Sequence, residues 1–381
     1  MAHCSLSFLF IILYSTFYNS PPHSSRFVFL PLFSLKTWTP VFPFYILLST
    51  FYNPSMPAKT PHLILLLCFL ALLAACAPSF TPPHDPALAE PELKEASFIS
   101  FDGTELPLRT WLPRDSINGP RFIIIALHGF NDYSNFIREP ALYFIEHRAS
   151  VYAYDQRGFG KAPARGFWGS SDAMARDLKT LVQLLAQEHP DLPIYLLGHS
   201  MGAAVIIQAM TAEHQPAVSG AILAAPAVWA RSTMPFYQYA SLWIVAHTIP
   251  WYKVTGEILE RTACSNKEAL RELSRDPLVI KETRFDAVYG LQNLMDEAYG
   301  AAARYTLNTL VLYGQHDEII PREPVLNAFQ RFPGVSNTQK QLIFYEDGYH
   351  MLLRDLQAEN VLRDIIAWIN NCSPDTKAAS N

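Results

Sequence analysis

A serine between two glycines constrains the fold of this chain more than any other feature. The stretch Gly198-His199-Ser200-Met201-Gly202 follows a strand-length apolar run, 193–197, and precedes a helix-forming run, 203–207. In this setting the pattern Gly-x-Ser-x-Gly predicts a tight strand-to-helix turn with the serine at its apex. A side chain at either glycine would collide with the neighbouring strand or helix. The alternative is an ordinary glycine turn, and we favour a nucleophilic Ser200.

Apolar strands and amphipathic helices alternate on both sides of this turn. The clearest helix carries Leu178, Leu181, Val182 and Leu185 on one face. Strands that alternate with helices form a mostly parallel sheet covered on both faces. We therefore predict an α/β fold with a mostly parallel, eight-stranded sheet. The expected strands are 97–101, 106–112, 121–127, 150–154, 193–197, 220–225, 308–313 and 341–345.

The alternation lapses between about Val228 and Arg304. This stretch is too long for a loop, so we predict an inserted, mostly helical cap over the rim where the strands end. Its first half, which includes 234–237, 242–245 and 249–252, is aromatic and apolar. Three interpretations stay open for this half: it lines an acyl pocket, it touches a bilayer, or it packs the cap onto the domain.

A serine hydroxyl needs a base within hydrogen-bond reach, and the base needs an acid to orient it. Folds with this elbow have the chain order Ser, Asp or Glu, His. Ser200, Asp317 and His350 satisfy that order, and each follows an expected strand. We prefer Asp317 to Glu318 because it lies nearer the strand end. The lower-ranked acids are Glu346 and Asp347, and the lower-ranked histidines are His199, His214, His247 and His316.

Two backbone N–H groups are expected to bind the oxyanion of a tetrahedral intermediate. Met201, next to the nucleophile, is one expected donor, and Phe130, in the loop after the third strand, is the other. His128 is expected to orient that loop. This chemistry requires no cofactor and no metal, and the five cysteines show neither metal-ligand spacing nor a dense disulfide framework. We expect Cys264 and Cys372 to remain separate, although an oxidising compartment would allow a disulfide.

From about Ser97 to Cys372 the chain resembles α/β-hydrolases of the monoacylglycerol lipase and lysophospholipase group, which are also classed with serine aminopeptidases. The motifs that carry the resemblance are Leu127-His128-Gly129-Phe130, Asp155-Gln156-Arg157-Gly158-Phe159-Gly160, Gly198-His199-Ser200-Met201-Gly202, Gly314-Gln315-His316-Asp317-Glu318-Ile319-Ile320-Pro321 and Tyr349-His350. The resemblance implies ester hydrolysis through a covalent acyl-enzyme on Ser200. Phe159 departs from the family, which usually has histidine there, and the resemblance does not extend to the cap sequence, which we could not match.

The first 55 residues differ in composition from the rest. They are rich in Phe, Leu, Tyr, Ser and Pro and contain no acidic residue. We expect a non-native or disordered extension there, with translation starting at Met56. Residues 56–76 are similar to the signal of bacterial lipoproteins: Lys59 precedes an apolar run, 63–73, of signal-peptide length, and Leu73-Ala74-Ala75-Cys76 resembles a lipobox. The competing interpretations are an ordinary cleaved signal and a short anchor helix.

The expected organisation follows from these segments. A proline-rich tether, 77–95, leads to the hydrolase domain, 96–372, and a flexible tail, 373–381. Acyl chains on Cys76 would anchor the chain in the bacterial cell envelope, with the outer membrane as the expected site. A net charge of −5 without a long basic tract argues against a nucleic-acid partner.

The leading hypothesis is a serine hydrolase that cleaves lipid esters of the monoacylglycerol or lysophospholipid type. A peptidase or amidase with the same triad is the alternative, and a catalytically silent binding protein ranks third. Ser200 argues against epoxide and haloalkane hydrolases, which need a carboxylate nucleophile. Acyl length, head group and oligomeric state cannot be derived from the sequence.

Overall fold

The computed structural model describes residues 77–83, 90–114, 119–255, 261–333 and 340–372. All of them belong to one compact unit, Leu65–Asn381. The predicted extension 1–55, the signal segment with Cys76 and the tail 373–381 lie outside the described residues. Among the helices that are described, none has both the length and the apolar character needed to cross a membrane.

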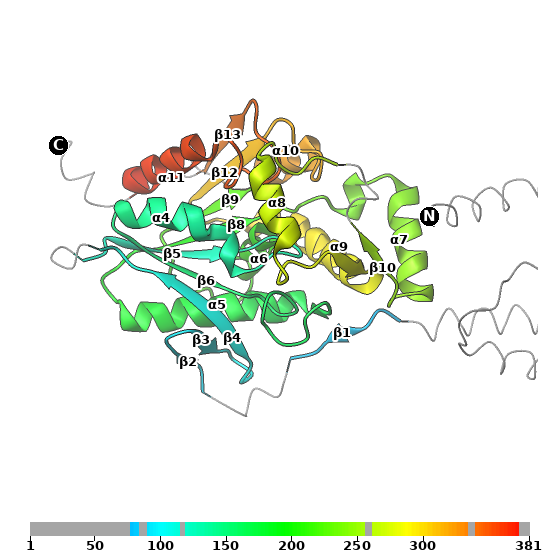
Figure 1. Cartoon of the computed structure of the whole chain (residues 1–381), viewed down its shortest axis with the longest axis horizontal. Coiled ribbons are helices and arrows are strands. Elements are labelled where there is room, and N and C mark those ends of the chain that lie inside the picture. The colour runs from blue at the N-terminus through cyan, green and yellow to red at the C-terminus, as the bar shows by residue number, and fades with distance from the viewer. Residues whose placement is uncertain (1–76, 84–89, 115–118, 256–260, 334–339, 373–381) are drawn as a thin grey trace, which may run out of the picture. The chain divides into compact units, whose positions relative to one another are not determined.

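A nine-stranded sheet forms the centre of the unit (Figure 1), in the order β13-β12-β9-β8-β5-β6-β4-β3-β2. The six strands from β13 to β6 run parallel, and the pairs β6–β4, β4–β3 and β3–β2 are antiparallel. The strands are β2 (Glu92–Leu93), β3 (Ser97–Ile99), β4 (Glu105–Trp111), β5 (Phe122–Leu127), β6 (Ala149–Tyr154), β8 (Ile194–His199), β9 (Gly220–Ala224), β12 (Thr309–Gly314) and β13 (Lys340–Tyr345).

Eight of these strands are the predicted ones, and the predicted count of eight is one short. The additional strand, β2, is only two residues long and pairs with β3 at the edge of the sheet. A two-residue strand is too short to show the period-two pattern that identifies strands in a sequence. The mostly parallel α/β architecture itself is confirmed.

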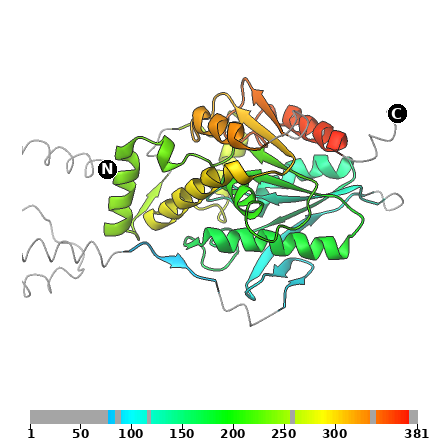
Figure 2. The same ribbon diagram turned by 180° about the vertical axis from the view of Figure 1, so that it is seen from behind.

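Helices cover both faces of the sheet because alternate residues of the buried strands point to opposite sides. Ile123 and Ile125 of β5 pack in one core cluster with α5, α6, α9 and α10. Ile124, between them, packs in a second cluster with α4 and α11. Figures 1 and 2 show the two helical layers from opposite sides. The helices are α4 (Arg138–Glu146), α5 (Ser171–Glu188), α6 (Met201–Ala209), α9 (Phe285–Ala301), α10 (Arg322–Arg331) and α11 (Ala358–Cys372).

The predicted cap, 228–304, is too wide at its C-terminal end. It contains α7 (Phe236–Thr248), α8 (Lys267–Arg275) and a hairpin of β10 (Lys253–Thr255) and β11 (Glu282–Arg284). The last helix of this range, α9, contacts α7 but also packs against α6 and α5, and it buries Leu294, Met295 and Ala298 in the main core. An amphipathic helix pattern shows that one face is buried, but not which elements bury it.

The predicted tether, 77–95, is also corrected. Its described parts are held by the domain: β1 (Phe80–Thr81) pairs in parallel with β7 (Trp168–Gly169), and β2 joins the main sheet. Backbone hydrogen bonds to β7 and β3 therefore fix two points of a segment whose proline content alone indicated an extended, unattached chain.

Candidate active site

Ser200 occupies a strained backbone turn between β8 and α6. Its φ of 52° and ψ of −110° lie in a region that non-glycine residues rarely adopt. Backbone bonds hold it there: Ser200 N–H donates to Ala224 O at 2.9 Å, and Ala227 N–H donates to Ser200 O at 3.1 Å. Such strain costs about 1–3 kcal/mol and is typical of functional sites. The neighbouring strand β9 thus contributes to fixing the turn.

The two glycines of the motif leave room for this turn. A Cβ at Gly198 would lie 2.5 Å from the backbone nitrogen of Ala203, and one at Gly202 would lie 2.3 Å from the carbonyl oxygen of Leu127. Both neighbours are main-chain atoms of the adjoining helix and strand, and they have little freedom to move. The structure therefore shows that a side chain at either position would collide with its neighbours, as the sequence predicts.

Asp317 and His350 meet across the loops that follow the neighbouring parallel strands β12 and β13. His350 Nδ1–H donates to Asp317 Oδ2 at 2.8 Å. The other carboxylate oxygen, Oδ1, accepts from the backbone N–H groups of Ile319 at 2.8 Å and Ile320 at 2.9 Å. The Asp317 side chain has no exposed surface. These bonds fix both the carboxylate and the imidazole that it orients.

The competing acids point elsewhere. The Glu318 carboxylate accepts from the backbone N–H of Thr262 at 2.7 Å, and the Asp347 carboxylate accepts from Gln357 Nε2 at 2.9 Å. Among the described residues, Asp317 alone pairs with the His350 ring. The structure thus favours Asp317 over its neighbour in the predicted Ser, Asp, His order.

His199 joins the loop of His350 to the serine turn. His199 Nε2 lies 3.1 Å from the carbonyl oxygen of His350, and the two ring centroids are 5.1 Å apart. No hydrogen bond within the described part of the chain connects the Ser200 hydroxyl to His350. Catalytic hydrogen bonds are often long in the absence of substrate, so this geometry is compatible with a serine–histidine pair.

The remaining histidines have structural or surface contacts. His128 is fully buried, donates from Nδ1 to Gly129 O at 2.8 Å and accepts from Gln156 N–H at 3.0 Å. Burial lowers the pKa of His128, which keeps its ring neutral. His316 stacks on Tyr349, and His247 bonds the Trp243 carbonyl within α7. These contacts agree with the expectation that His128 orients the adjoining loop.

The two expected oxyanion donors lie at free backbone positions. Met201 is the first residue of α6, where a helical N–H has no intrahelical partner. Phe130 N–H likewise donates to no other residue in the described ranges. A Cβ placed on Gly129, next to Phe130, would lie 3.5 Å from Ser200 Cβ, so this loop passes directly beside the serine. The arrangement leaves two N–H groups available near the nucleophile.

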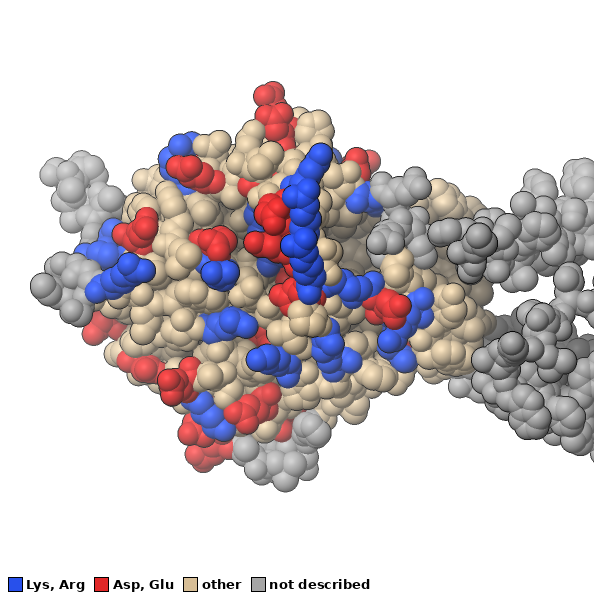
Figure 3. Space-filling view, in the orientation of Figure 1, with Lys and Arg blue, Asp and Glu red and all other residues tan. Residues whose placement is uncertain are grey.

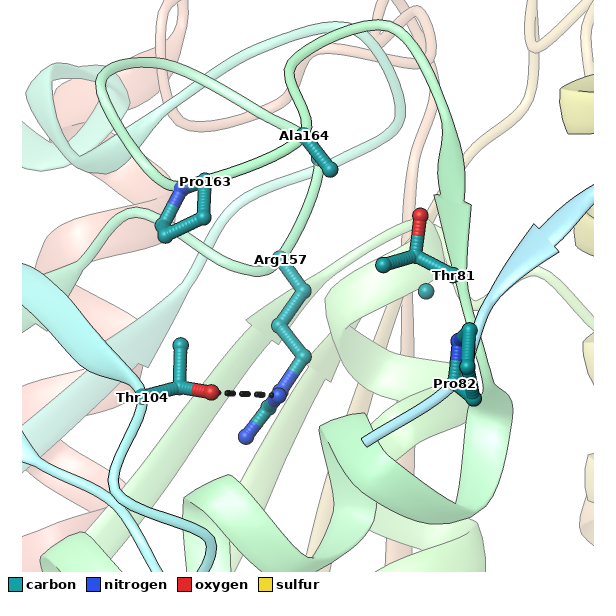
Figure 4. A pocket seen from close by; sticks show the side chains of 8 residues that line it. Thr81, Pro82, Thr104, Arg157, Pro163 and Ala164 are labelled. Carbon is teal, nitrogen blue, oxygen red and sulfur yellow. Dashed lines mark hydrogen bonds between the residues drawn. The ribbon is translucent and has the colours of Figure 1, made fainter. Parts of the chain in front are cut away.

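A buried ion cluster, which the sequence did not reveal, is centred on Arg157. Arg157, from the loop after β6, forms paired hydrogen bonds with Asp102 at 2.8 Å and with Asp177 at 2.6 and 2.7 Å. Arg157 also bonds the Thr104 hydroxyl at 2.9 Å (Figure 4). Despite burial, Arg157 holds the pKa of Asp102 well below its usual range. In Figure 4, Thr81 of β1 lies across a small pocket from this arginine.

Phe159, the departure from the family motif, packs beneath the oxyanion loop. Its ring lies 5.4 Å from His128, 5.6 Å from Phe130 and 6.4 Å from Trp168, in edge-to-face contacts. Asp155, at the start of the same loop, accepts from Ser134 N–H at 2.9 Å. The loop after β6 therefore supports the loop after β5 through aromatic packing and a carboxylate contact.

Known proteins are similar to most of this chain. The profile of the family described as "Serine aminopeptidase, S33" matches residues 118–357. The chain is 28% identical over 306 residues to a monoglyceride lipase of Rattus norvegicus, covering 78% of this chain and 95% of that protein. It is 28% identical over 290 residues to a monoacylglycerol lipase of Mycolicibacterium smegmatis, covering 72% and 96%.

Among solved structures, a soluble variant of monoglyceride lipase from Saccharomyces cerevisiae, in complex with a substrate analogue, matches with a TM-score of 0.62. The match covers 77% of this chain and 99% of that chain at 20% identity. At this identity the likeness shows a shared fold.

Proposed function

The chain belongs to the serine aminopeptidase S33 family, has the α/β-hydrolase fold and is a carboxylic ester hydrolase; on this premise we propose that it cleaves esters of lipids through an acyl-enzyme formed on Ser200. The observation that carries the proposal is the hydrogen bond of 2.8 Å from His350 to the buried carboxylate of Asp317. It joins the expected base and acid at the rim where the strained serine lies.

In the acylation step, Ser200 Oγ attacks the ester carbonyl carbon while His350 Nε2 takes the hydroxyl proton. Asp317 holds the ring with Nε2 facing the serine and stabilises the imidazolium that forms. The carbonyl oxygen becomes an oxyanion, which the N–H groups of Phe130 and Met201 stabilise. When the intermediate collapses, the alcohol leaves with a proton from His350, and the acyl group stays on Ser200.

Deacylation repeats these steps with water. His350 takes a proton from a water molecule, whose oxygen attacks the acyl carbon of the Ser200 ester. The same N–H pair holds the second oxyanion, and its collapse expels the Ser200 oxygen, which regains a proton from His350. The products are a free fatty acid and the enzyme in its starting state.

Two observations support a lipid substrate. The relatives of similar length are named for monoglyceride or monoacylglycerol hydrolysis. The inserted cap helix α7 has an apolar, aromatic composition, which suits contact with acyl chains. A peptidase or amidase is the second candidate, because the matching family is described as a serine aminopeptidase.

A comparison of turnover on different substrates tests the proposal. The full-length chain is assayed with a monoacylglycerol, a lysophospholipid, short and long p-nitrophenyl esters, and aminoacyl anilides. We expect kcat/KM for long-chain esters to exceed that for anilides by orders of magnitude. Faster anilide cleavage would support the peptidase, and absence of turnover on every substrate would support a silent binding protein.

We also propose that Cys76 carries a lipid and places the enzyme in a bacterial envelope. The support is the sequence Leu73-Ala74-Ala75-Cys76 at the end of an apolar run of signal length. Intact-mass analysis of the mature protein, purified from the cells that naturally produce it, tests this. A mature N-terminus at Cys76 with added acyl mass is expected, whereas a terminus upstream of Cys76 would contradict it.

A further inference from the structure

The loop that carries the expected base, residues 346–356, is fixed at three consecutive residues, and we call it the base loop. The backbone N–H of Tyr349 donates to the Asp355 carboxylate at 3.0 Å. The carbonyl oxygen of His350 accepts from the imidazole of the residue before the nucleophile, 3.1 Å away. The backbone N–H of Met351 donates to the carbonyl oxygen of Ala263, in the cap, at 3.0 Å. The backbone is therefore held on both sides of the base as well as at the base itself.

Asp355 joins the base loop to the cap. It is buried, with 5% of the residue exposed. Oδ2 accepts from Tyr349, and Oδ1 accepts from the backbone N–H of Ser265 at 2.9 Å and from the Ser265 hydroxyl. Oδ1 also accepts from the N–H of Leu356 at 3.0 Å. One carboxylate thus bonds both the residue before the base and Ser265, which belongs to residues 263–266, here called the cap segment.

Two more residues of the cap segment contact the base loop. The Asn266 side chain donates from Nδ2 to the carbonyl oxygen of Arg354 at 3.1 Å, and the buried Cys264 thiol lies 3.7 Å from that oxygen. Asn266 is also the N-cap of α8, whose nine residues, all described, are exposed or half-buried. In Figure 3, charged side chains gather where Figure 1 places α8. The cap segment is therefore held by its bonds to the base loop, since burial of α8 contributes little.

The donors that surround the Asp355 carboxylate are uncharged. They are backbone N–H groups, a hydroxyl and a thiol. Although burial disfavours the charged form, the bonds from Ser265 and from the backbone N–H groups hold the pKa of Asp355 below its usual range. The same bonds therefore stabilise the charge of Asp355 and fix the backbone next to His350.

We propose that Asp355 is a positioning residue for the base: it holds the backbone before His350 so that Nε2 faces Ser200, and it makes this position depend on the cap segment. Asp355 acts through the Tyr349 N–H and not on the reacting atoms. A catalytic group displaced by about 1 Å can lose on the order of 10²-fold in rate. The inference rests on the proposed function, because it assigns Asp355 a part in the same reaction.

Asp355→Asn tests this role on the full-length chain. An amide has one acceptor oxygen and one donor group, so either orientation places a donor against the N–H of Tyr349 or that of Ser265. Steady-state kinetics on a short soluble ester are measured at a temperature at which every variant is folded. We expect kcat to fall by about 10–100-fold, the scale of a misplaced catalytic group, while KM changes by less than about twofold. Equal losses in kcat and kcat/KM place the defect in the chemical steps.

The proton between His350 and Asp317 provides a signature of the ring position that does not depend on turnover. In a hydrogen bond from imidazole to carboxylate, this proton resonates far downfield of the amide protons in a one-dimensional proton NMR spectrum. His350→Ala removes the proton and so identifies the resonance. We expect Asp355→Asn to shift or weaken the resonance, because the ring no longer lies in line with the Asp317 carboxylate.

Asp286→Asn is the matched control for loss of stability. The Asp286 side chain has no exposed surface and pairs with Arg284 through two bonds, at 2.9 and 2.5 Å. It lies at the start of α9, outside both the base loop and the cap segment. We expect this substitution to lower the midpoint of thermal unfolding and to leave kcat and the downfield resonance at their wild-type values.

Ser265→Ala tests the link to the cap segment, and it replaces Asp355→Asn if that variant does not fold. It removes the hydroxyl donor to Asp355 and keeps the backbone bond. We expect kcat to fall a few-fold and the downfield resonance to shift. Wild-type kcat with an unshifted resonance in Ser265→Ala would overturn the dependence on the cap segment.

Wild-type kcat or an unchanged resonance in folded Asp355→Asn overturns the proposal, since the ring then keeps its place without the carboxylate. A fall in kcat of similar size in Asp286→Asn also overturns it and assigns the effect to a general loss of stability. If the wild type hydrolyses no ester, the proposed function fails, and the resonance in Asp355→Asn still decides whether Asp355 positions the His350 ring.

Discussion

His199 donates its Nε2 proton to the main-chain carbonyl oxygen of His350, 3.1 Å away. A carbonyl oxygen only accepts hydrogen bonds, so the contact fixes the proton of His199 on Nε2. The residue before the nucleophile therefore holds the loop that carries the base. Burial, and then the nearby charge of His350, lower the pKa of His199 to about 3, which keeps its ring neutral.

The lowered pKa of His199 predicts that this residue makes the folded protein less stable in acid. An unfolded His199 takes up a proton near pH 6.5, whereas the folded protein resists protonation until about pH 3. Within this window the unfolded chain binds more protons, so the unfolding free energy falls as the pH is lowered from 6.5 toward 3. His199→Gln removes this titration and retains an amide donor for the His350 carbonyl. We expect its stability, measured by urea unfolding at a series of pH values, to decline less steeply.

In His199→Gln the unfolding free energy should depend less on pH, but the dependence should not disappear. Burial also lowers the pKa of His128, so that residue destabilises the fold in acid as well. His199→Ala controls for the hydrogen bond: it removes both the titration and the donor, so it should be less stable than His199→Gln at neutral pH. Parallel stability curves for the wild type and His199→Gln would contradict the prediction.

Gly202→Ala is expected to disrupt the serine turn. The new Cβ would lie 2.3 Å from the carbonyl oxygen of Leu127, so β5 or α6 must shift, and both adjoin the oxyanion donors. We expect ester turnover to be largely lost, with a lower midpoint of thermal unfolding. Gly300→Ala is the control: nothing lies within 4 Å of its Cβ position, and alanine in a helix is favoured by roughly 0.5–1 kcal/mol. Retained turnover in Gly202→Ala would show that the turn tolerates the side chain.

Asp317→Asn tests whether Asp317, and not its neighbour Glu318, is the acid that orients His350. The amide keeps the shape of the side chain but cannot stabilise the imidazolium. In a serine protease that has the same triad on an unrelated fold, the corresponding change lowers kcat by about 10⁴. Glu318→Gln provides the matched control, because Glu318 bonds the Thr262 backbone and not His350. Steady-state kinetics on a short ester should show near wild-type kcat for the control. A comparable loss in both variants would argue against the assignment of Asp317.

Arg157→Met is expected to destabilise the fold. It leaves Asp102 and Asp177 buried without their partner, and breaking a buried ion pair costs about 3–5 kcal/mol. Arg271→Ala, which breaks an exposed pair with Glu268 within α8, should cost at most about 0.5 kcal/mol. Unfolding free energies from urea titrations compare the two, and a loss in Arg157→Met as small as that in Arg271→Ala would contradict the role of the cluster.

The parts of the site that the sequence predicts share one physical basis. Ser200 and Asp317 follow the buried strands β8 and β12, and His350 follows the partly buried strand β13. The carboxyl ends of parallel strands meet at one rim. The glycines of the elbow are recognisable because the pattern Gly-x-Ser-x-Gly lies between a strand and a helix, although Gly202 contacts Leu127 of the distant strand β5. Local patterns therefore predict the turn, the order of the expected triad and the expected oxyanion positions.

The parts that the sequence does not predict depend on contacts between distant segments. Arg157 pairs with Asp102 and Asp177, and none of the three has a local signal that names its partner. The pairing of Phe80–Thr81 with Trp168–Gly169 involves two residues on each side, too few for a strand pattern. The burial of α9 against α6 is likewise decided by tertiary packing and not by helix periodicity.

Covalent labelling by a fluorophosphonate probe examines the nucleophile itself. The probe phosphonylates a serine that a neighbouring base activates, so mass spectrometry of the full-length chain should show one adduct on the peptide that contains Ser200. Ser200→Ala should show no adduct, and His350→Ala should be labelled far more slowly while remaining folded. Labelling at Ser200 that depends on His350 is the predicted result. An unlabelled Ser200 in folded protein, or an adduct on another residue, would contradict the proposed acyl-enzyme.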